Sequence, residues 1–379
     1  KKAAPAKKAA VKKPAAKKAP AKKKSALGAV PKQKVALVTG ASGFAGGHMV
    51  DFLIDKGWHV IGTDLERADR KYVNPKSEFI PADITNPATL GVLFEKKPSV
   101  VYHPAAVFDY EAPWDLCEKV NVFGMRNMCE ASLKAGGVDR FVLFSTVSVY
   151  GHPREEELPV VETNEMRPGT NYERSKLMQE EVGLEYFDKG LPVSIVRPAP
   201  VYGPRNVYGF ATILFLVAKF PIVPFPVNID LRMVGVHVKD VVGAAYFVSD
   251  KQGSLGEAYN VSDDSNYTVR EVIDTLAPQL GVRMAPVFIP RELFFQFSDH
   301  AADLSRTVAK YAHTRPFIEK DMVYYLKAIY SFSNAKLKAL GYKFHCPDML
   351  VGLDETVKWY KENGYLDRKE LWMKVFERI

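Results

Sequence analysis

The stretch Val35-Ala36-Leu37-Val38-Thr39-Gly40-Ala41-Ser42-Gly43-Phe44-Ala45-Gly46 decides the fold of this chain. Its first five residues predict a buried strand, and a helix-length amphipathic segment follows the glycines. Glycines at such a junction let the chain turn sharply and bring backbone N–H groups to a pyrophosphate. The Gly-x-x-Gly-x-x-Gly spacing alone is weak evidence, but strand, loop and helix occur in the required order. We therefore predict a phosphate-binding loop formed by Gly40, Ser42, Gly43, Phe44, Ala45 and Gly46.

Short β-branched runs alternate with helix-length amphipathic segments from residue 34 to about residue 197. We predict strands at 35–39, 59–63, 78–81, 100–103, 141–145 and 193–197. We predict helices at 45–56, 87–96, 115–135 and 171–189. This alternation is typical of a parallel sheet that helices cover on both faces. The sequence therefore predicts an α/β fold, a Rossmann-type doubly wound parallel sheet.

Beyond Arg197 the regular pattern weakens. Residues 198–226 are rich in Pro, Gly and aromatic side chains with little helical or strand period, so we expect substrate-specific structure there. The apolar segment 208–227 contains Lys219 and three prolines, which a membrane-spanning helix rarely contains, so we interpret it as a substrate lid. Further helices are expected from residue 238, at 268–276 and at 352–363. The predicted domains are a tail at 1–33, a nucleotide-binding domain at 34–200, and a smaller C-terminal substrate lobe at 201–379 with a return segment at 236–262.

The overall basicity of the chain comes from its N-terminal segment. The formal net charge is +8, but residues 1–34 contain thirteen lysines and no acidic residue, so the remaining chain has a net charge of −5. Up to Lys24, lysine pairs repeat among Ala and Pro with almost nothing to bury, which predicts a disordered basic tail. Such a tail can bind nucleic acid or an anionic membrane surface weakly, or it can serve only as a solvated tether.

Cysteine usage and targeting patterns bear on the cellular setting. Cys117, Cys129 and Cys346 are odd in number and fit no metal-ligand spacing, so we expect neither a disulfide framework nor a metal site. No segment has the charged, apolar and small-residue order of a secretory signal. We therefore expect a cytoplasmic protein, and peripheral contact with a membrane is the alternative that the tail and segment 208–227 leave open.

Acidic residues at two predicted strand ends indicate which cofactor the loop binds. Asp64 closes the second strand, 24 residues after the first loop glycine, where a carboxylate accepts hydrogen bonds from the adenosine ribose and repels a 2′-phosphate. This favours NAD over NADP, although Arg67 and Arg70 follow closely and can weaken the preference. Asp83, followed by Ile84, lies just past the third strand and is placed to meet the adenine amino group. Either aspartate could instead belong to an ordinary turn.

Tyr172 and Lys176 form a Tyr-x-x-x-Lys pair, and a spacing of four places both side chains on one face of a helix. A tyrosine normally ionises near pH ~10, but a neighbouring ammonium favours the phenolate and lowers the pKa. Lys176 can also hold a nicotinamide ribose. Upstream, the strand at 141–145 delivers hydroxyl groups to the carboxyl edge of the sheet, where ligands of such folds bind. The candidates for a hydrogen bond to the reacting oxygen of a substrate are Ser145, Thr146 and Ser148.

Taken in order, these features resemble the extended short-chain dehydrogenase/reductase family, from Lys34 to about Tyr365. The resemblance rests on Thr39 to Gly46, Asp64, Asp83, His103-Pro104-Ala105-Ala106, Asn121-Val122-Phe123-Gly124, Ser145-Thr146, Tyr172 with Lys176, and Arg197-Pro198-Ala199-Pro200-Val201-Tyr202-Gly203-Pro204. Two positions depart from the family pattern. Pro104 stands where many members have Leu, and Ala199 stands where nucleotide-sugar epimerases and dehydratases often have Asn.

The resemblance implies roles for individual residues. Thr146 stands where the family has its catalytic Ser or Thr, Tyr172 is the acid/base, and Lys176 supports it. It also implies that NAD is contacted by Ala105, Ala106, Asn121, Ser145, Tyr172, Lys176, Arg197 and Pro198. Family members often form homodimers through two helices, for which 115–135 and 171–189 are the candidates.

The shared mechanism has Tyr172 take the proton of a secondary alcohol while hydride passes to the nicotinamide, with Thr146 and Tyr172 holding the developing oxyanion. The predicted substrate lobe is rich in large apolar side chains: Phe210, Ile213, Leu214, Phe215, Phe220, Ile222, Val223, Phe225, Phe288, Phe294 and Phe295. Such a lining suits a sterol or a long-chain β-hydroxy acid better than a sugar nucleotide, whose diphosphate needs Arg and Lys.

Among subgroups of the family, the chain is most similar in appearance to the 3β-hydroxysteroid dehydrogenase-like enzymes of steroid biosynthesis. The stretch from Arg315-Pro316 through Phe332-Ser333-Asn334-Ala335-Lys336-Leu337 to Leu340-Gly341-Tyr342 resembles the C-terminal end of that subgroup. Two alternatives stay open at this point. One is a nucleotide-sugar epimerase or dehydratase that retains tightly bound NAD. The other is a non-enzymatic NAD-binding regulator.

Overall fold

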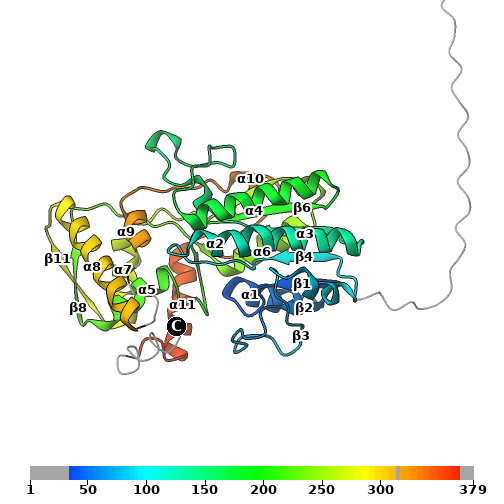
Figure 1. Cartoon of the computed structure of the whole chain (residues 1–379). Coiled ribbons are helices and arrows are strands. Elements are labelled where there is room, and N and C mark those ends of the chain that lie inside the picture. The colour runs from blue at the N-terminus through cyan, green and yellow to red at the C-terminus, as the bar shows by residue number, and fades with distance from the viewer. Residues whose placement is uncertain (1–33, 313–315, 317, 319, 368–379) are drawn as a thin grey trace, which may run out of the picture. The chain divides into compact units, whose positions relative to one another are not determined.

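The computed structural model describes residues 34–312, 316, 318 and 320–367, which belong to one compact unit. At its centre lies a seven-stranded sheet with the strand order β10-β6-β5-β4-β1-β2-β3, in which all neighbouring strands are parallel (Figure 1). The strands are β1 (Val35–Thr39), β2 (His59–Thr63), β3 (Glu78–Phe79), β4 (Val100–His103), β5 (Arg140–Phe144), β6 (Val193–Pro198) and β10 (Ala258–Val261). The strand order reverses between β1 and β4, and in open α/β sheets ligands bind beside such a reversal. The predicted Rossmann-type α/β fold is confirmed.

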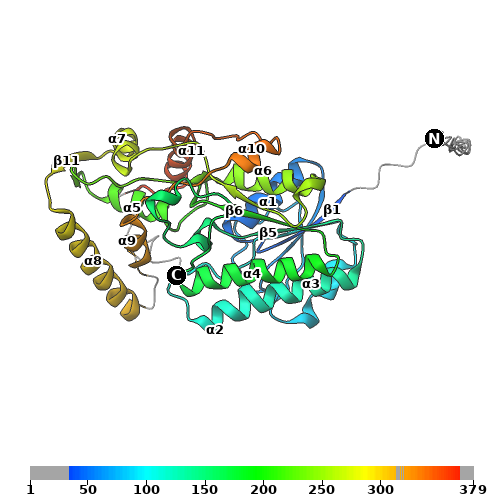
Figure 2. The ribbon, with the colours of Figure 1, turned by 90° about the horizontal axis from the view of Figure 1, so that it is seen from above.

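Helices cover both faces of this sheet (Figure 2). On one face, α1 (Phe44–Asp55) and α6 (Val238–Ser249) lie side by side. On the other face, α3 (Gly124–Ala135) and α4 (Asn171–Asp188) lie side by side. The central strands are therefore buried on both faces, as in other parallel sheets of doubly wound folds.

The core explains why the central strands have almost no polar residues. Successive side chains of a strand point to opposite faces. Ala36 and Val38 pack into a core cluster with Met49 of α1, whereas Leu37 between them packs into a different cluster with Met125 of α3. Because both faces bury apolar side chains, β1 is a continuous apolar run and shows no alternation of polar and apolar residues.

A second group of elements lies beyond the carboxyl ends of the central strands (Figure 1). It consists of α5 (Phe210–Lys219), β8 (Ile222–Pro226), α7 (Val269–Leu280), β11 (Arg283–Val287), α8 (Arg291–Ala312), α9 (Lys320–Leu326) and α11 (Met349–Glu362). β8 and β11 pair in parallel, and a cluster that includes Leu214, Ile273 and Tyr360 forms a separate core. Two further strands, β7 (Val201–Tyr202) and β9 (Val236–His237), also pair in parallel, and α10 (Ala335–Ala339) contacts β10.

Two of the predicted helices differ from the observed structure. Residues 87–96 form two short 3-10 helices, Pro87–Thr89 and Gly91–Phe94, because Gly91 interrupts a segment too short to continue as an α-helix. The predicted helix at 115–135 consists of α2 (Trp114–Cys117), a π-helical segment at Glu118–Phe123, and α3. The segment after β4 is therefore helical, but it changes from α-helix to π-helix and back and is not one uninterrupted α-helix.

The predictions also missed several elements, among them β10 of the central sheet, α5, β8 and α8. We expected little regular structure at 198–226, but α5 and β8 form there. α5 is apolar around most of its circumference, so it has no clear helical period, and the prolines that obscure β8 lie in a two-stranded sheet where few ladder hydrogen bonds are needed. α8 was not predicted either, although it has 22 residues. The predicted disorder of residues 1–33 lies outside the described residues.

Candidate active site

A cavity of about 1030 Å³ lies at the carboxyl ends of the central strands. Fifteen of the predicted site residues line it: Gly40, Gly43, Phe44, Ala45, Gly46, Asp64, Asp83, Ile84, Ala105, Ala106, Ser145, Thr146, Tyr172, Lys176 and Pro198. Residues from seven separate segments therefore meet at one place. Ser42, Asn121 and Arg197 are not among the lining residues. Their side chains make hydrogen bonds that are described below.

The glycine loop turns tightly between β1 and α1. Gly40 has a φ of +61°, which an L side chain rarely adopts, and the Gly43 N–H donates to the Gly40 carbonyl at 3.0 Å. A Cβ atom at Gly46 would lie 2.0 Å from that same carbonyl oxygen. The loop therefore holds the first turn of α1 against the end of β1. Gly43, Phe44, Ala45 and Gly46 of this helix end line the cavity, and the N–H groups of a helix N-terminus can bind a pyrophosphate.

Asp64 follows β2 and lies beside the loop. One carboxylate oxygen accepts hydrogen bonds from the Ser42 hydroxyl and, at 3.3 Å, from the Ser42 N–H, while the other accepts from the Leu65 N–H at 2.8 Å. Ser42 thus orients Asp64 without lining the cavity itself. Arg67 lines the same part of the cavity. Asp83 lies nearby, and its carboxylate accepts from the Thr85 N–H at 2.8 Å, so this aspartate also shapes its own turn.

Asn121 braces the loop that follows β4. Its side-chain oxygen accepts from the Val107 N–H at 2.8 Å, and its amide nitrogen donates to the Val107 carbonyl at 3.2 Å and to the Ser175 hydroxyl at 2.8 Å. The side chain is fully buried. Asn121 therefore joins the loop to α4, and any effect it has on a cofactor passes through the position of Ala105 to Val107.

Three hydroxyl groups follow β5 in the order that the sequence predicts. Thr146 Oγ1 accepts from the Ser148 N–H at 3.1 Å, and the two hydroxyls also lie 3.1 Å apart, so Thr146 caps the short helix at Val147–Tyr150. Ser145 Oγ is buried and has no hydrogen-bond partner among the described residues, although it belongs to the cavity lining. A buried hydroxyl without a partner is unusual, and a ligand in the cavity would satisfy it.

Tyr172 does not have the environment that the Tyr-x-x-x-Lys spacing suggests. The rings of Phe108 and Tyr110 pack edge-on against it, with centroids 5.3 and 5.2 Å away. Burial raises the pKa of the Tyr172 phenol above its usual value, and the neighbouring Glu173 carboxylate raises it further. Our expectation that a neighbouring ammonium lowers this pKa is therefore wrong for the protein as it stands.

The reason is the position of the Lys176 ammonium. Lys176 Nζ donates to the Phe144 carbonyl at 2.6 Å and to the side-chain oxygen of Gln179. Burial lowers the pKa of Lys176 to about 7, and the Glu180 carboxylate partly opposes this effect. Tyr172 and Lys176 both line the cavity, but burial favours the neutral form of each.

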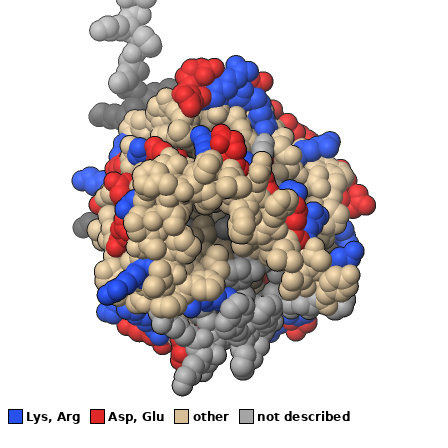
Figure 3. All heavy atoms as spheres, turned by 90° about the vertical axis from the view of Figure 1, so that its left-hand side faces the viewer, with Lys and Arg blue, Asp and Glu red and all other residues tan. Residues whose placement is uncertain are grey.

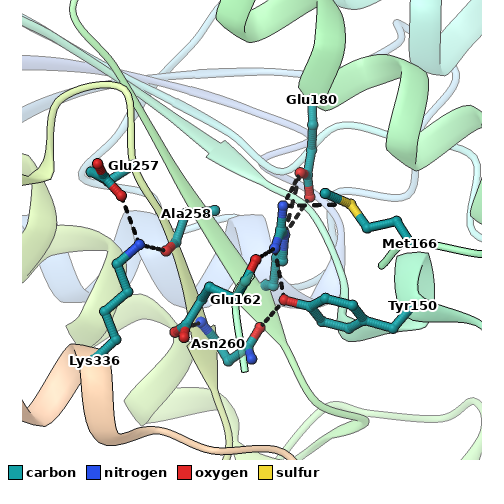
Figure 4. Close-up of polar contacts among 9 residues, drawn as sticks. Tyr150, Glu162, Met166, Glu180, Glu257, Ala258, Asn260 and Lys336 are labelled. Carbon is teal, nitrogen blue, oxygen red and sulfur yellow. Dashed lines mark hydrogen bonds and ion pairs between the residues drawn. The ribbon is translucent and has the colours of Figure 1, made fainter. Parts of the chain in front are cut away.

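Arg197 forms a buried ion pair with Glu180, which Figure 4 shows among the polar contacts around Tyr150 and Asn260. Its guanidinium donates to both oxygens of Glu180, with Nη2 at 2.6 Å and Nε at 2.9 Å, and Nη1 donates to the Tyr150 hydroxyl at 2.7 Å. Tyr150 in turn donates to the Asn260 side chain at 2.9 Å. The network joins β6, α4 and β10 below Lys176. Arg197 of β6 is thus a structural residue that holds α4 through Glu180, and the predicted direct contact with the cofactor has no support in the cavity lining.

The substrate end of the cavity differs from the predicted one. Of the described apolar residues that we expected there, Ile213 lines the cavity, whereas Leu214, Phe215 and Phe295 are buried in the core and Phe220, Ile222 and Phe288 are exposed. The large side chains that do line this end are Phe108, Tyr110, Tyr208, Met233, Tyr325, Leu326, Tyr330 and Phe332. The apolar character was predicted, but most of the residues were not.

Long-range contacts explain why these residues were missed. Tyr325 of α9 donates to the Glu173 carboxylate beside Tyr172, and its ring stacks on His152 at 5.9 Å. Tyr330 lies within hydrogen-bond distance of His152 Nδ1, at 2.9 Å. These partners are more than 150 residues apart in the sequence, and no local pattern marks them.

The residues of the site fit a dinucleotide. The glycine loop leaves room that a Cβ atom would fill, Asp64 presents a carboxylate beside it, and Ser145 offers a buried hydroxyl further along the cavity. In folds of this kind, such a loop, carboxylate and strand-end hydroxyl meet the pyrophosphate, the adenosine ribose and the nicotinamide end of the dinucleotide respectively. In the described part of the chain, no group of three or more His, Cys, Asp and Glu residues is placed to hold a metal ion.

Comparisons with known proteins define the family. The model of the NAD dependent epimerase/dehydratase family matches residues 36–262. The chain is 31% identical over 280 residues to UDP-glucose 4-epimerase of Mycolicibacterium smegmatis, which covers 68% of this chain and 86% of that protein. It is 26% identical over 359 residues to the decarboxylating sterol-4-alpha-carboxylate 3-dehydrogenase of Mus musculus, with coverage of 90% and 94%.

Solved structures agree with this assignment. The UDP-glucose 4-epimerase of Thermotoga maritima, determined with UDP-glucose, superimposes with a TM-score of 0.67 at 25% identity and covers 87% of this chain and 99% of that one. The chain therefore belongs to the NAD dependent epimerase/dehydratase family. It is an enzyme of the extended short-chain dehydrogenase/reductase type, which leaves the non-enzymatic alternative without support.

Proposed function

We propose that this enzyme interconverts a secondary alcohol and a ketone on a hydrophobic substrate, such as a sterol or a long-chain β-hydroxy acid, with NAD as its cofactor. The observation that carries the proposal is the apolar wall contributed by residues 198–349. Among the described lining residues of that wall, Arg232 is the single cation, and its guanidinium is bound to Asp230 at 3.0 Å and to the Asn266 carbonyl at 3.3 Å. A diphosphate would have to compete with these partners, whereas an apolar ring system or chain would not.

NAD, when bound, supplies a nicotinamide ring that accepts or returns a hydride. The glycine loop would hold the pyrophosphate, and Asp64 would hold the adenosine ribose and disfavour the 2′-phosphate of NADP. In the direction of ketone reduction, the neutral Tyr172 phenol that burial favours donates its proton to the substrate oxygen, to which Thr146 also donates. In the direction of alcohol oxidation, the Tyr172 phenolate takes the proton of the alcohol at its phenolic oxygen. Lys176, which donates to the Phe144 carbonyl and Gln179, would support Tyr172 by turning its ammonium toward the phenolic oxygen. Phe108 and Tyr110 exclude water from Tyr172.

A nucleotide-sugar epimerase or dehydratase is the second candidate. It is favoured by the 31% identity with the mycobacterial UDP-glucose 4-epimerase, which exceeds the identity with the sterol dehydrogenase. Such an enzyme would use Tyr172 in the same way but would retain NAD and return the hydride to its substrate. Ala199, where the family's epimerases often have Asn, counts against it.

The experiment that tests the proposal is a turnover assay with NAD and a small panel of substrates: a 3β-hydroxysterol, a 3-hydroxy fatty acid and UDP-sugars. Formation of NADH with the sterol or the hydroxy acid is the expected result. Conversion of a UDP-sugar without release of NADH, by protein that already contains NAD, would refute it in favour of the epimerase.

Replacing Tyr172 by Phe tests the catalytic assignment directly. The variant should lose turnover, by roughly a hundredfold or more, while its affinity for NADH stays within a few-fold of the parent, because acid/base catalysis and cofactor binding are separate tasks of the site. Tyr246→Phe is a matched control, since Tyr246 packs on Phe52 and Trp58 on the far face of the sheet. Retained turnover in Tyr172→Phe would show that another group transfers the proton.

A further inference from the structure

α8 has an exposed apolar face in addition to its buried one. Phe297, Leu304 and Tyr311 are 74%, 66% and 83% exposed, and Leu293 and Val308 are about half exposed. With 3.6 residues per turn, these five side chains fall within an arc of roughly 60° and form a stripe along the whole helix. We call Leu293, Phe297, Leu304, Val308 and Tyr311 the α8 stripe. Another side of the helix, with Phe295, Ala302 and Ala309, is buried against the protein.

The charged side of α8 forms ion pairs with other parts of the molecule. Arg306 pairs with Glu111 at 3.2 Å, Asp303 pairs with Lys320 at 3.1 Å, and Asp299 pairs with Lys327 at 2.9 Å. In an ordinary surface helix the charged side faces water and the apolar side faces the core. Here ion pairs hold α8 in an orientation that leaves the α8 stripe in solvent.

The stripe continues into an apolar part of the molecular surface. Phe288, which precedes α8, is 86% exposed, and Phe220 and Ile222 beside and within β8 are about half exposed. β8, β11 and α8 lie together at one side of the molecule (Figures 1 and 2). Figure 3 shows this side, and its middle consists of residues other than Lys, Arg, Asp and Glu around a hollow. Exposed apolar surfaces of this kind mark interaction sites.

Two occupants could cover the stripe, a second copy of the chain or a lipid surface. A pair of helices needs apolar residues at both seam positions of a heptad. In the heptad set by Phe297, Leu304 and Tyr311, the second seam positions are Leu293, His300 and Thr307, so two of the three would bury polar side chains. A helix pair through this seam is therefore poorly matched.

A lipid surface agrees with the remaining features. Aromatic rings lie at both ends of this apolar surface: Phe288 precedes α8, and Tyr311 of the α8 stripe lies in its last turn. Aromatic side chains favour the boundary between water and acyl chains. The segment 1–34 supplies thirteen lysines and no acid, which anionic headgroups attract. No helix in the part of the chain that the structure describes is long and apolar enough to cross a membrane. The helix would thus lie in the plane of the interface.

We propose that the α8 stripe, with Phe288, docks this enzyme on the surface of an anionic phospholipid bilayer. α8 packs on α9, whose Tyr325 and Leu326 line the substrate end of the cavity. Docking would therefore bring that end of the cavity close to a reservoir of apolar substrate. This second consequence rests on the proposed function, whereas the docking itself does not.

The test is co-sedimentation of the full chain with phosphatidylcholine vesicles that contain about one third phosphatidylserine, at low salt and at about 0.5 M salt, which screens the lysines. Phe297→Asp together with Leu304→Asp alters the stripe. Gln296→Asp together with Thr307→Asp is the matched control, because it adds the same charge to exposed polar positions of the same helix. An NADH titration of each protein verifies that the fold is intact.

We expect the parent and the control pair to bind the vesicles at both salt concentrations, and the stripe pair to bind roughly a hundredfold more weakly, about tenfold for each apolar side chain lost. Equal binding by the stripe pair and the parent, or no binding by the parent, would overturn the proposal. A parent that is dimeric without vesicles and becomes monomeric in the stripe pair would assign the surface to a second copy. The assay contains no substrate, so failed docking and a failed turnover assay are distinguishable.

Discussion

Replacing Glu180 by Gln should strongly destabilise the enzyme, because it leaves the Arg197 guanidinium buried without its counter-ion. The Arg197 and Glu180 side chains are 5% and 3% exposed, and three hydrogen bonds of 2.6, 2.9 and 3.2 Å join them. Breaking such a pair by removing one partner costs about 3–5 kcal/mol of the free energy of unfolding. The Tyr150 hydroxyl, which also accepts from Arg197 at 2.7 Å, cannot replace a negative charge.

Glu180→Met combined with Arg197→Met provides the matched control. This double variant removes both charges and fills the space with apolar side chains, so it should recover most of the stability that the single variant loses. The Tyr150 hydroxyl keeps its bond to Asn260 at 2.9 Å in either case. Equilibrium unfolding in urea, followed by tryptophan fluorescence, gives the free energy of unfolding for the parent and both variants.

Two results would refute this reasoning. A Glu180→Gln variant within about 1 kcal/mol of the parent would show that Arg197 is solvated after all, as exposed pairs are. A double variant no more stable than the single one would show that shape or hydrogen bonding at this position matters more than the unpaired charge. An NADH titration of both variants should follow their stabilities, because Lys176 lies one turn from Glu180 on the same helix.

Three further predictions concern the cavity. The wild-type free energy of unfolding should rise with pH between about 7 and the ordinary lysine pKa of 10.5, because in that window Lys176 is protonated in the unfolded chain but neutral in the folded one. Urea unfolding at about pH 6 and at about pH 10 measures this rise, and the Lys176→Met variant should abolish it. Asp64→Ala should weaken NADH by roughly tenfold and NADPH by less, in parallel fluorescence titrations; equal losses would contradict a role in choosing the cofactor. Gly46→Ala should abolish NADH binding, since its Cβ would lie 2.0 Å from the Gly40 oxygen, and unchanged affinity would show that the loop can move.

The central sheet could be predicted because its signals are local. Strands β1, β2 and β4 have the predicted bounds, and the loop after β1 has the glycines that its positive φ and its close contacts require. Burial on both faces makes such strands apolar without interruption, which is visible in any short window. By contrast, α5 and α8 are obscured because each has apolar residues on more than one side.

The candidate site was predictable in its parts but not in its electrostatics. The Tyr-x-x-x-Lys spacing correctly places Tyr172 and Lys176 at the cavity. The pKa of Tyr172 is raised by burial, to which Phe108 and Tyr110 contribute by packing against its ring, and by the Glu173 carboxylate. None of these contacts follows from the spacing of the pair.

Burial acts in opposite directions on the pKa values of the two candidate catalytic groups, and this makes Glu180 important for chemistry as well as for stability. Burial raises the pKa of Tyr172 and lowers that of Lys176 to about 7, so the neutral forms are favoured. Glu180 opposes the effect on Lys176, but Arg197 neutralises most of its charge at 2.6 Å. A free carboxylate one turn away would fix Lys176 as an ammonium, whereas the paired carboxylate leaves it able to exchange a proton near neutral pH. The buried pair beneath the site therefore holds α4 in place without committing Lys176 to one charge state.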